Sequence, residues 1–517
     1  MDRAMQGNRA GVVSGTVGFA SRGIVQILLF GVTIVATRTL SVADFGAYAL
    51  GSLFLVLARQ LFYVGPYEYL LKAPDDRGLL SACLAANMVQ ASVLAALLGA
   101  LWLVAPLLFA STEVGRILAM LVPSVWLVAL IAWYEAVLLR SLRVRRYYAS
   151  TLIGDAVGAA IAVVLLIRGH GVASLVIQAY ARLVVLLALH VSSTGERPRL
   201  KADPAAVLAV LRWSVARHAA VLLNFTANFG ADFVLGICLS PAATGLYRAA
   251  SRIVSAMTDL FAQPLQKIAQ TNLSASVARR RNPGASWLTM LSGVGTVAWA
   301  GLLTLAVLAP DLVPLALGDK WTPAVPIVVV FCAAKALSLL DAVTTSFLVC
   351  HDRQRAMLKA QVAAAVSVIA LSWLASPWGP RAVAVAVGIA SAGLSLTYGA
   401  MVTRLSQTDG QAVRGLLRTA APPVLSVAAG LAVLKFAAPD LAGITAVLAG
   451  GAVAGLSFSA AAFCVRQRML NAIGSLGHHL GAGPAPAPAD LAPPPLVPPS
   501  TAGVIPGPAP PPAPAIS

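Results

Sequence analysis

Long uninterrupted stretches of apolar residues recur along most of the chain, separated by charged residues or by Pro- and Gly-rich breaks. Most run for roughly 18 to 25 residues, the length that a helix rising about 1.5 Å per residue needs to cross about 30 Å of hydrocarbon. The pattern predicts an all-α membrane protein with about 14 transmembrane helices. The expected spans are 12–36, 44–65, 79–105, 117–139, 149–167, 171–191, 211–238, 246–266, 285–309, 324–350, 360–375, 382–403, 419–437 and 441–464.

Lys and Arg residues are unevenly distributed among the segments between these spans. With the N-terminus placed in the cytoplasm, the inner segments hold 24 of them and the outer loops hold 6. Because Lys and Arg of short loops are retained on the cytoplasmic side of a bilayer, this distribution predicts that both termini are cytoplasmic.

The composition narrows the classes of function. Hydrophobic residues make up 59% of the chain and charged residues 11%, against about 25% charged in soluble proteins, which excludes soluble enzymes. The formal charge of +18 comes from basic residues dispersed among the loops, so the clustering that nucleic-acid binding requires is missing. The five cysteines lie in apolar runs without a C-x-x-C pair or a His at ligand spacing. We therefore expect free thiols, no metal site and no cofactor.

One short motif occurs twice. Leu40–Tyr48 and Leu239–Tyr247 share Leu, Ser, Ala, Gly and Tyr at equivalent positions, and both lie at an outer turn, six spans apart. This spacing predicts two parallel repeats related by an axis along the membrane normal. Transporters built from such repeats bind substrate between the halves.

The repeat and the composition together predict four regions. The tail contains 14 prolines between Gly483 and Ser517, a composition that favours extended polyproline II or disorder. The regions are an N-terminal lobe of helices 1–6 (1–200), a C-terminal lobe of helices 7–12 (201–404), two extra transmembrane helices (405–465) and a Pro-rich cytoplasmic tail (466–517).

Several stretches resemble one known family. Thr39–Tyr48 is similar to the R-x-L-s-p-e-d-F-G-x-Y stretch of Wzx-type polysaccharide flippases, in the multidrug/oligosaccharidyl-lipid/polysaccharide (MOP) exporter superfamily. Asp232–Gly236, followed by Ala243–Ala250, resembles the second-lobe signature of that family, and Pro310–Trp321 resembles a later loop motif. One departure is Cys350–Arg353, where the family more usually has Gly followed by Lys or Arg.

The resemblance covers residues 8–465 or so and implies a MATE-like fold of two pseudo-symmetric six-helix lobes with two additional C-terminal helices. It further implies movement of an undecaprenyl-diphosphate-linked oligosaccharide across the bacterial inner membrane, for surface polysaccharide, lipopolysaccharide or exopolysaccharide biosynthesis. The implied partners are the lipid-linked oligosaccharide and membrane lipid. A polysaccharide polymerase and glycosyltransferases are candidate protein partners.

Independently of this resemblance, ionisable residues fall inside the expected spans. An Arg at the bilayer centre costs about 2.5 to 3.5 kcal/mol even on insertion scales, and guanidinium groups bind phosphate oxygens bidentately. We interpret these arginines as a cationic series that draws a diphosphate headgroup into a central cavity. The expected substrate-binding residues are Arg22, Arg59, Arg217, Arg248, Arg252, Asn224 and Asn228.

Other roles stay open for some of these residues. Arg59 and Arg217 could instead extend to the cytoplasmic surface and Arg248 to the outer one, whereas Arg22 lies about 15 Å deep and cannot. Asp232 and Asp259 are candidates for ion coupling, as proton or sodium sites, or for counter-ions.

Two further groups of residues have structural interpretations. The deep Arg182 and Lys335 are expected to pair with a carboxylate, that of Asp155, Asp341 or Glu135. The G-x-x-x-G pairs Gly11–Gly15, Gly154–Gly158 and Gly451–Gly455 predict close helix contacts.

Two rival functions share this membrane setting. A polymerase or ligase of lipid-linked sugars needs an outer catalytic surface, but the longest expected outer loop, Pro310–Pro323, offers neither a His nor a paired carboxylate. A drug or peptidoglycan-precursor exporter of the same fold is the closer alternative.

Overall fold

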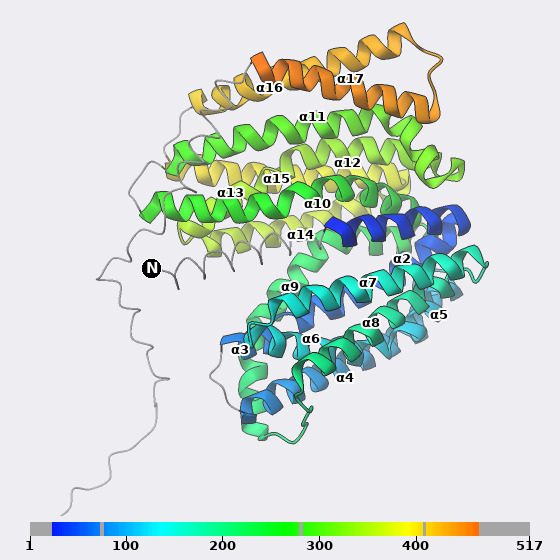
Figure 1. Ribbon diagram of the computed structural model, residues 1–517, viewed down its shortest axis with the longest axis vertical. Helices are drawn as coiled ribbons and strands as arrows, with labels where there is room; N and C mark the ends of the chain where they lie inside the picture. Colours follow the sequence, from blue (N-terminus) through cyan, green and yellow to red (C-terminus); the bar gives the residue numbers. More distant parts are fainter. Residues whose placement is uncertain (1–22, 73–76, 279–282, 407–409, 465–517) are drawn as a thin grey trace, which may run out of the picture.

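The structure is a computed structural model that describes residues 23–72, 77–278, 283–406 and 410–464. All regular elements in these ranges are helical, which confirms the all-α class (Figure 1). Arg22, Gly11–Gly15 and the Pro-rich tail lie outside the described residues. The helices are Gly23–Thr39, α2 (Val42–Phe62), α3 (Pro66–Lys72), α4 (Arg77–Leu108), α5 (Thr112–Leu121), α6 (Ser124–Arg140), α7 (Val144–Ile167), α8 (Ala173–Thr194), α9 (Pro204–Cys238), α10 (Pro241–Ala278), α11 (Pro283–Leu317), η1 (Asp319–Ala324), α12 (Val325–Ser338), α13 (Asp341–Cys350), α14 (Gln354–Ala375), η2 (Ser376–Trp378), α15 (Pro380–Ser406), α16 (Gly410–Ala437) and α17 (Gly443–Cys464).

Each of the expected spans coincides with a helix, or with consecutive helices, in the described part of the chain. Eleven helices there are long and apolar enough to cross a membrane, or twelve if α5 and α6, bent by 40°, form one span. The remaining two are the shorter apolar helix Gly23–Thr39 and the polar, 38-residue α10. A multi-pass membrane fold is therefore confirmed, while the count of 14 stays a prediction.

The helical segment that corresponds to the expected span 44–65 extends to Lys72, with a break inside it. The chain breaks at Gly65, which has a φ of +66°, and resumes as the short helix α3. A Cβ atom on Gly65 would lie 2.7 Å from Ser214 Oγ of α9, so the break also allows α9 to pack closely there. As a result α3, expected to be part of a loop, lies against α4, α6 and α9.

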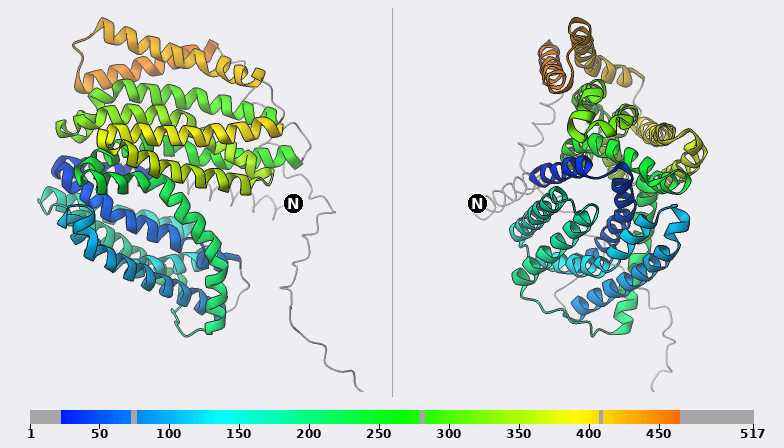
Figure 2. Two further views of the ribbon diagram at one scale, coloured as in Figure 1. Left: turned by 180° about the vertical axis from the view of Figure 1, so that it is seen from behind. Right: turned by 90° about the vertical axis from the view of Figure 1, so that its right-hand side faces the viewer.

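The helices form two groups. In Figure 1, α2 and α4–α8 lie in the lower group, and α10–α15 lie in the upper group with α16 and α17 packed on α11. The long helix α9 contacts α4 in one group and α14 in the other. The groups meet through α2 and α10 near the ends where these helices begin, and they diverge toward the opposite end, as the view from behind also shows (Figure 2).

The predicted glycine contacts are correct in one helix and wrong in another. A Cβ atom on Gly154 would lie 2.9 Å from Leu186 Cγ, and one on Gly158 would lie 3.2 Å from Gln178 O, so α7 and α8 pack closely. Gly451 and Gly455 have nothing within 4 Å of such an atom. The neighbouring Gly450 makes the contact with Leu308 instead, because the face of α17 turned toward α11 is one residue away from the predicted one.

Candidate functional site

The described candidate residues lie on three helices where the two groups meet. Arg59 is on α2, and α10 carries Arg248 and Arg252. Asp259 is also on α10, but its side chain lies outside the described part. The remaining four share one face of α9 at spacings of seven and four residues, as predicted. They are Arg217, Asn224, Asn228 and Asp232.

Arg217 forms an ion pair that sequence reasoning missed. Its Nε lies 2.5 Å from Glu68 Oε2 on α3, and its guanidinium lies 3.6 Å from the ring centroid of Trp213. The two charged side chains are 34% and 38% exposed. Glu68 follows the break at Gly65 and was expected in a loop, so only the structure places it opposite α9.

Arg248 is also paired, but in a far more buried setting. Its Nε lies 2.7 Å from Asp232 Oδ1, and its guanidinium lies 4.6 Å from the ring centroid of Phe229. The Asp232 side chain is fully buried and that of Arg248 is 20% exposed. The contact between the two side chains is an ion pair without an aligned hydrogen bond. Asp232 is thus the counter-ion of Arg248, one of the roles that the sequence left open.

Two asparagines extend the polar face of α9. Asn228 Nδ2 donates to Asn224 O at 2.8 Å and to Asn224 Oδ1 at 3.0 Å, and both side chains are exposed. Exposed amides are costly in hydrocarbon, which favours an aqueous environment on this face. On α10, Arg252 is exposed.

A buried carboxylate lies near the C-terminal end of α2. Glu135 of α6 is 4% exposed and accepts hydrogen bonds from the hydroxyl groups of Tyr63 and, at 3.4 Å, Tyr67. Arg59 is exposed and interacts electrostatically with Glu135. The sequence carried one signal of this arrangement, the two tyrosines four residues apart on either side of Gly65.

The prediction that two deep cations pair with carboxylates is confirmed for one of them. Arg182 forms an ion pair with Asp155, which confirms that prediction. Lys335 interacts electrostatically with Asp341, whose Oδ2 also accepts a hydrogen bond from Ser395 Oγ at 2.7 Å.

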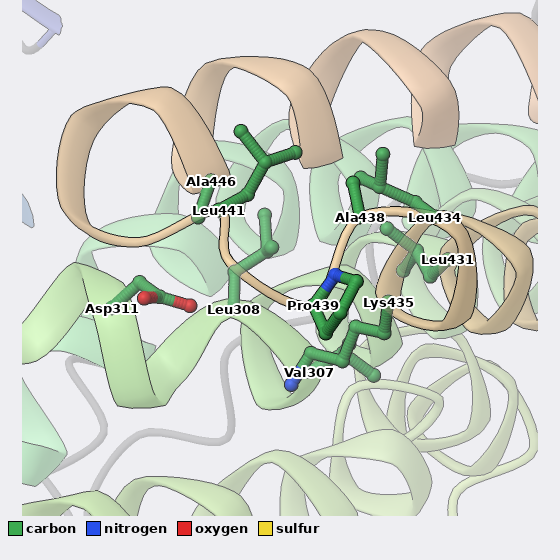
Figure 3. Close-up of a pocket in the computed structure, with 10 residues that line it drawn as sticks. All are labelled: Val307, Leu308, Asp311, Leu431, Leu434, Lys435, Ala438, Pro439, Leu441 and Ala446. Atoms are coloured by element: carbon green, nitrogen blue, oxygen red, sulfur yellow. The ribbon is translucent and has the colours of Figure 1, made fainter.

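A cavity of about 280 Å³ lies away from these residues, between α11 and the turn that joins α16 to α17 (Figure 3). Its walls are mostly apolar, with Asp311 and Lys435 as the charged side chains. It includes none of the candidate residues. Among the described residues, no three His, Cys, Asp or Glu side chains are grouped so that they could hold a metal ion.

The fold is similar to that of solved transporters, among them members of the MOP superfamily. It is similar to the lipid II flippase MurJ in an inward closed conformation, at a TM-score of 0.71 and 13% identity, covering 89% of this chain and 100% of that one. It is also similar to an inward-facing multidrug resistance MATE transporter (TM-score 0.59, 12% identity, 75% and 96% covered) and to a MOP-superfamily transporter from Pyrococcus furiosus (0.51, 12%, 76% and 94%). At these identities the likeness is one of fold alone.

A family model described as "Polysaccharide biosynthesis protein" matches residues 35–326. The chain belongs to this polysaccharide biosynthesis family, as the resemblance of its motifs indicated. No curated protein matches it.

Proposed function

We propose that this protein is a flippase that moves an undecaprenyl-diphosphate-linked oligosaccharide from the cytoplasmic to the outer leaflet. The family and the transporter fold support a lipid-linked substrate of polysaccharide synthesis. The observation that carries the proposal is a set of polar side chains on α2, α9 and α10, the helices through which the two groups meet, in a chain that is otherwise strongly apolar. Its members are Arg59, Arg217, Arg252, Asn224 and Asn228, each exposed or partly exposed.

The two arginine pairs differ in how readily a substrate can replace the carboxylate. A diphosphate accepts short, charge-assisted bonds from a guanidinium fork. The Arg217–Glu68 pair is partly exposed, and pairs of this kind contribute only about 0 to 1 kcal/mol, so the headgroup can displace Glu68. Arg248 has a fully buried partner, which would be left as an uncompensated charge. We assign direct phosphate contact to Arg217, with Arg22, Arg59 and Arg252, and a supporting role to Arg248.

Transport then follows from alternating access between two lobes. We take 1–200 and 201–404 as the lobes, with 405–465 as two additional helices and 466–517 as a cytoplasmic tail. The distribution of Lys and Arg supports cytoplasmic termini in a bacterial inner membrane. Asp259 stays the candidate for ion coupling, because the carboxylate of Asp232 already forms an ion pair with Arg248.

Reconstitution in liposomes tests the proposal. A fluorescent undecaprenyl-diphosphate oligosaccharide is placed in one leaflet, and its movement is followed by quenching. R217A is expected to lower the rate about tenfold or more, because the loss of a bidentate phosphate contact removes a charge-assisted interaction. The rate for R217K should lie between those of R217A and the wild-type protein, since Lys keeps the charge but lacks the two parallel N–H donors of a guanidinium group. The matched control R168A removes an exposed arginine from the turn between α7 and α8 and should leave the rate unchanged. Wild-type rates for R217A would contradict the proposal.

A peptidoglycan precursor is the second candidate substrate. The match to the lipid II flippase covers 89% of this chain, against 75% for the MATE transporter. Both substrates carry the same lipid diphosphate, so the sugar decides between them. The same assay with lipid II as competitor separates the two: strong competition would favour the precursor.

A further inference from the structure

Three sequence motifs that lie far apart along the chain meet at the end where the helix groups converge. Trp321 of η1 is fully buried and donates its indole N–H to Thr37 O at 2.9 Å. Lys320 Nζ donates to Arg38 O at 3.1 Å and to Leu40 O at 2.5 Å. The ring of Phe45, at the start of α2, meets that of Trp321 edge to face at 5.3 Å. Phe45 packs against the apolar cores of both groups.

The polar contacts cap two helices reciprocally. The last carbonyl groups of a helix have no partner within the helix and attract cations. Lys320, just beyond α11, binds carbonyl groups at the end of helix Gly23–Thr39. Arg38, at the end of that helix, donates to Ala316 O at 3.3 Å and to Leu315 O, in the last turn of α11. Each helix end is therefore satisfied by a cation from the other group.

The two repeats also touch each other at this end. A Cβ atom on Gly46 would lie 1.8 Å from Pro241 O, and one on Gly245 would lie 2.5 Å from Val42 O. Both contacts are with backbone, which cannot move aside as a side chain can. The crossing of α2 and α10 thus requires glycine at both positions.

We propose that Arg38, Lys320, Trp321 and the crossing of Gly46 with Gly245 form a latch that closes the outer side of the transporter and opens once in every transport cycle. The proposal depends on the alternating access of the proposed function. It gives a role to Lys320, Trp321 and the two glycines of these motifs, none of which belongs to the set of side chains that we assign to the substrate. Backbone carbonyl groups as acceptors make the latch reversible, because opening exposes them to water and leaves no buried charge unpaired.

Distance measurements between spin labels test the latch without any substrate. Labels at H170C and W378C, in exposed turns at the latch end of the two groups, report the separation; C464S removes the exposed native thiol. Lys320 and Arg38 are exposed, so K320M and R38M should fold. Each should raise the ratio of long to short distances about fivefold to tenfold, because charge-assisted hydrogen bonds are lost. R381M, which removes an exposed arginine at the start of α15, is the matched control and should not change the ratio.

The variant G46A gives the sharpest result. Its methyl group is incompatible with the closed crossing, so the long distance should predominate. Unchanged distances in K320M, R38M and G46A would overturn the latch, whatever the variants do in transport. Lengthened distances together with no movement of oligosaccharide in the wild-type protein would support the latch and refute the proposed substrate.

Discussion

Replacing Arg248 by Met should destabilise the protein far more than replacing Arg217 by Met, although both changes remove one arginine of an ion pair. In R248M the fully buried carboxylate of Asp232 loses its counter-ion. Removing one partner of a buried pair typically costs about 3 to 5 kcal/mol, because the remaining charge stays desolvated. In R217M the remaining carboxylate is that of Glu68, which is 38% exposed and can be hydrated. Exposed pairs contribute about 1 kcal/mol or less.

The measurement is thermal unfolding of the purified protein in detergent, followed by tryptophan fluorescence. We expect a clear drop in the midpoint for R248M and almost none for R217M. The double variant R248M/D232N separates loss of charge compensation from loss of packing, since it removes the stranded charge along with the arginine. It should recover most of the difference. Equal midpoints for the two single variants, or a double variant no more stable than R248M, would refute the reasoning.

Three further predictions concern other parts of the molecule. G158L should lower the unfolding midpoint, because its side chain has no room between α7 and α8, whereas G451L should have little effect, because nothing lies within 4 Å of a Cβ atom there. Y63F removes a hydrogen bond to the buried Glu135 and should cost about 1 to 3 kcal/mol of stability, measurable in the same assay. R59A should slow oligosaccharide movement in liposomes with little change in the midpoint, since its side chain is exposed; a large drop in the midpoint would assign Arg59 a structural role instead.

The helices were largely predictable from the sequence, whereas the partners of the charged residues were predictable only in part: the pairing of Arg182 with Asp155 was expected, and that of Arg217 was not. Apolar runs determine where a chain can cross a membrane, so all expected spans coincide with helices, including the polar α10. That helix contacts α2, α11, α12 and α13.

The pairing of Arg217 with Glu68 could not be predicted, because the two residues lie 149 positions apart and meet only through the break at Gly65. The error at Gly451 has a similar cause: the spacing of small residues identifies a contact face only to within about one residue, and the neighbouring helix decides which face is used.

The internal repeat and the latch have a common geometric explanation. In the aligned motifs Gly46 corresponds to Gly245, and Val42 to Pro241. Gly46 lies close to the carbonyl of Pro241, and Gly245 lies close to the carbonyl of Val42. The two contacts are therefore equivalent, with the roles of the two repeats exchanged. This is the self-complementary pattern of a two-fold interface. A residue next to such an axis faces its own equivalent, so any side chain would be present twice in the same space. A close crossing of α2 and α10 at the axis therefore requires glycine in both repeats. This requirement explains why the two copies of the motif share a glycine.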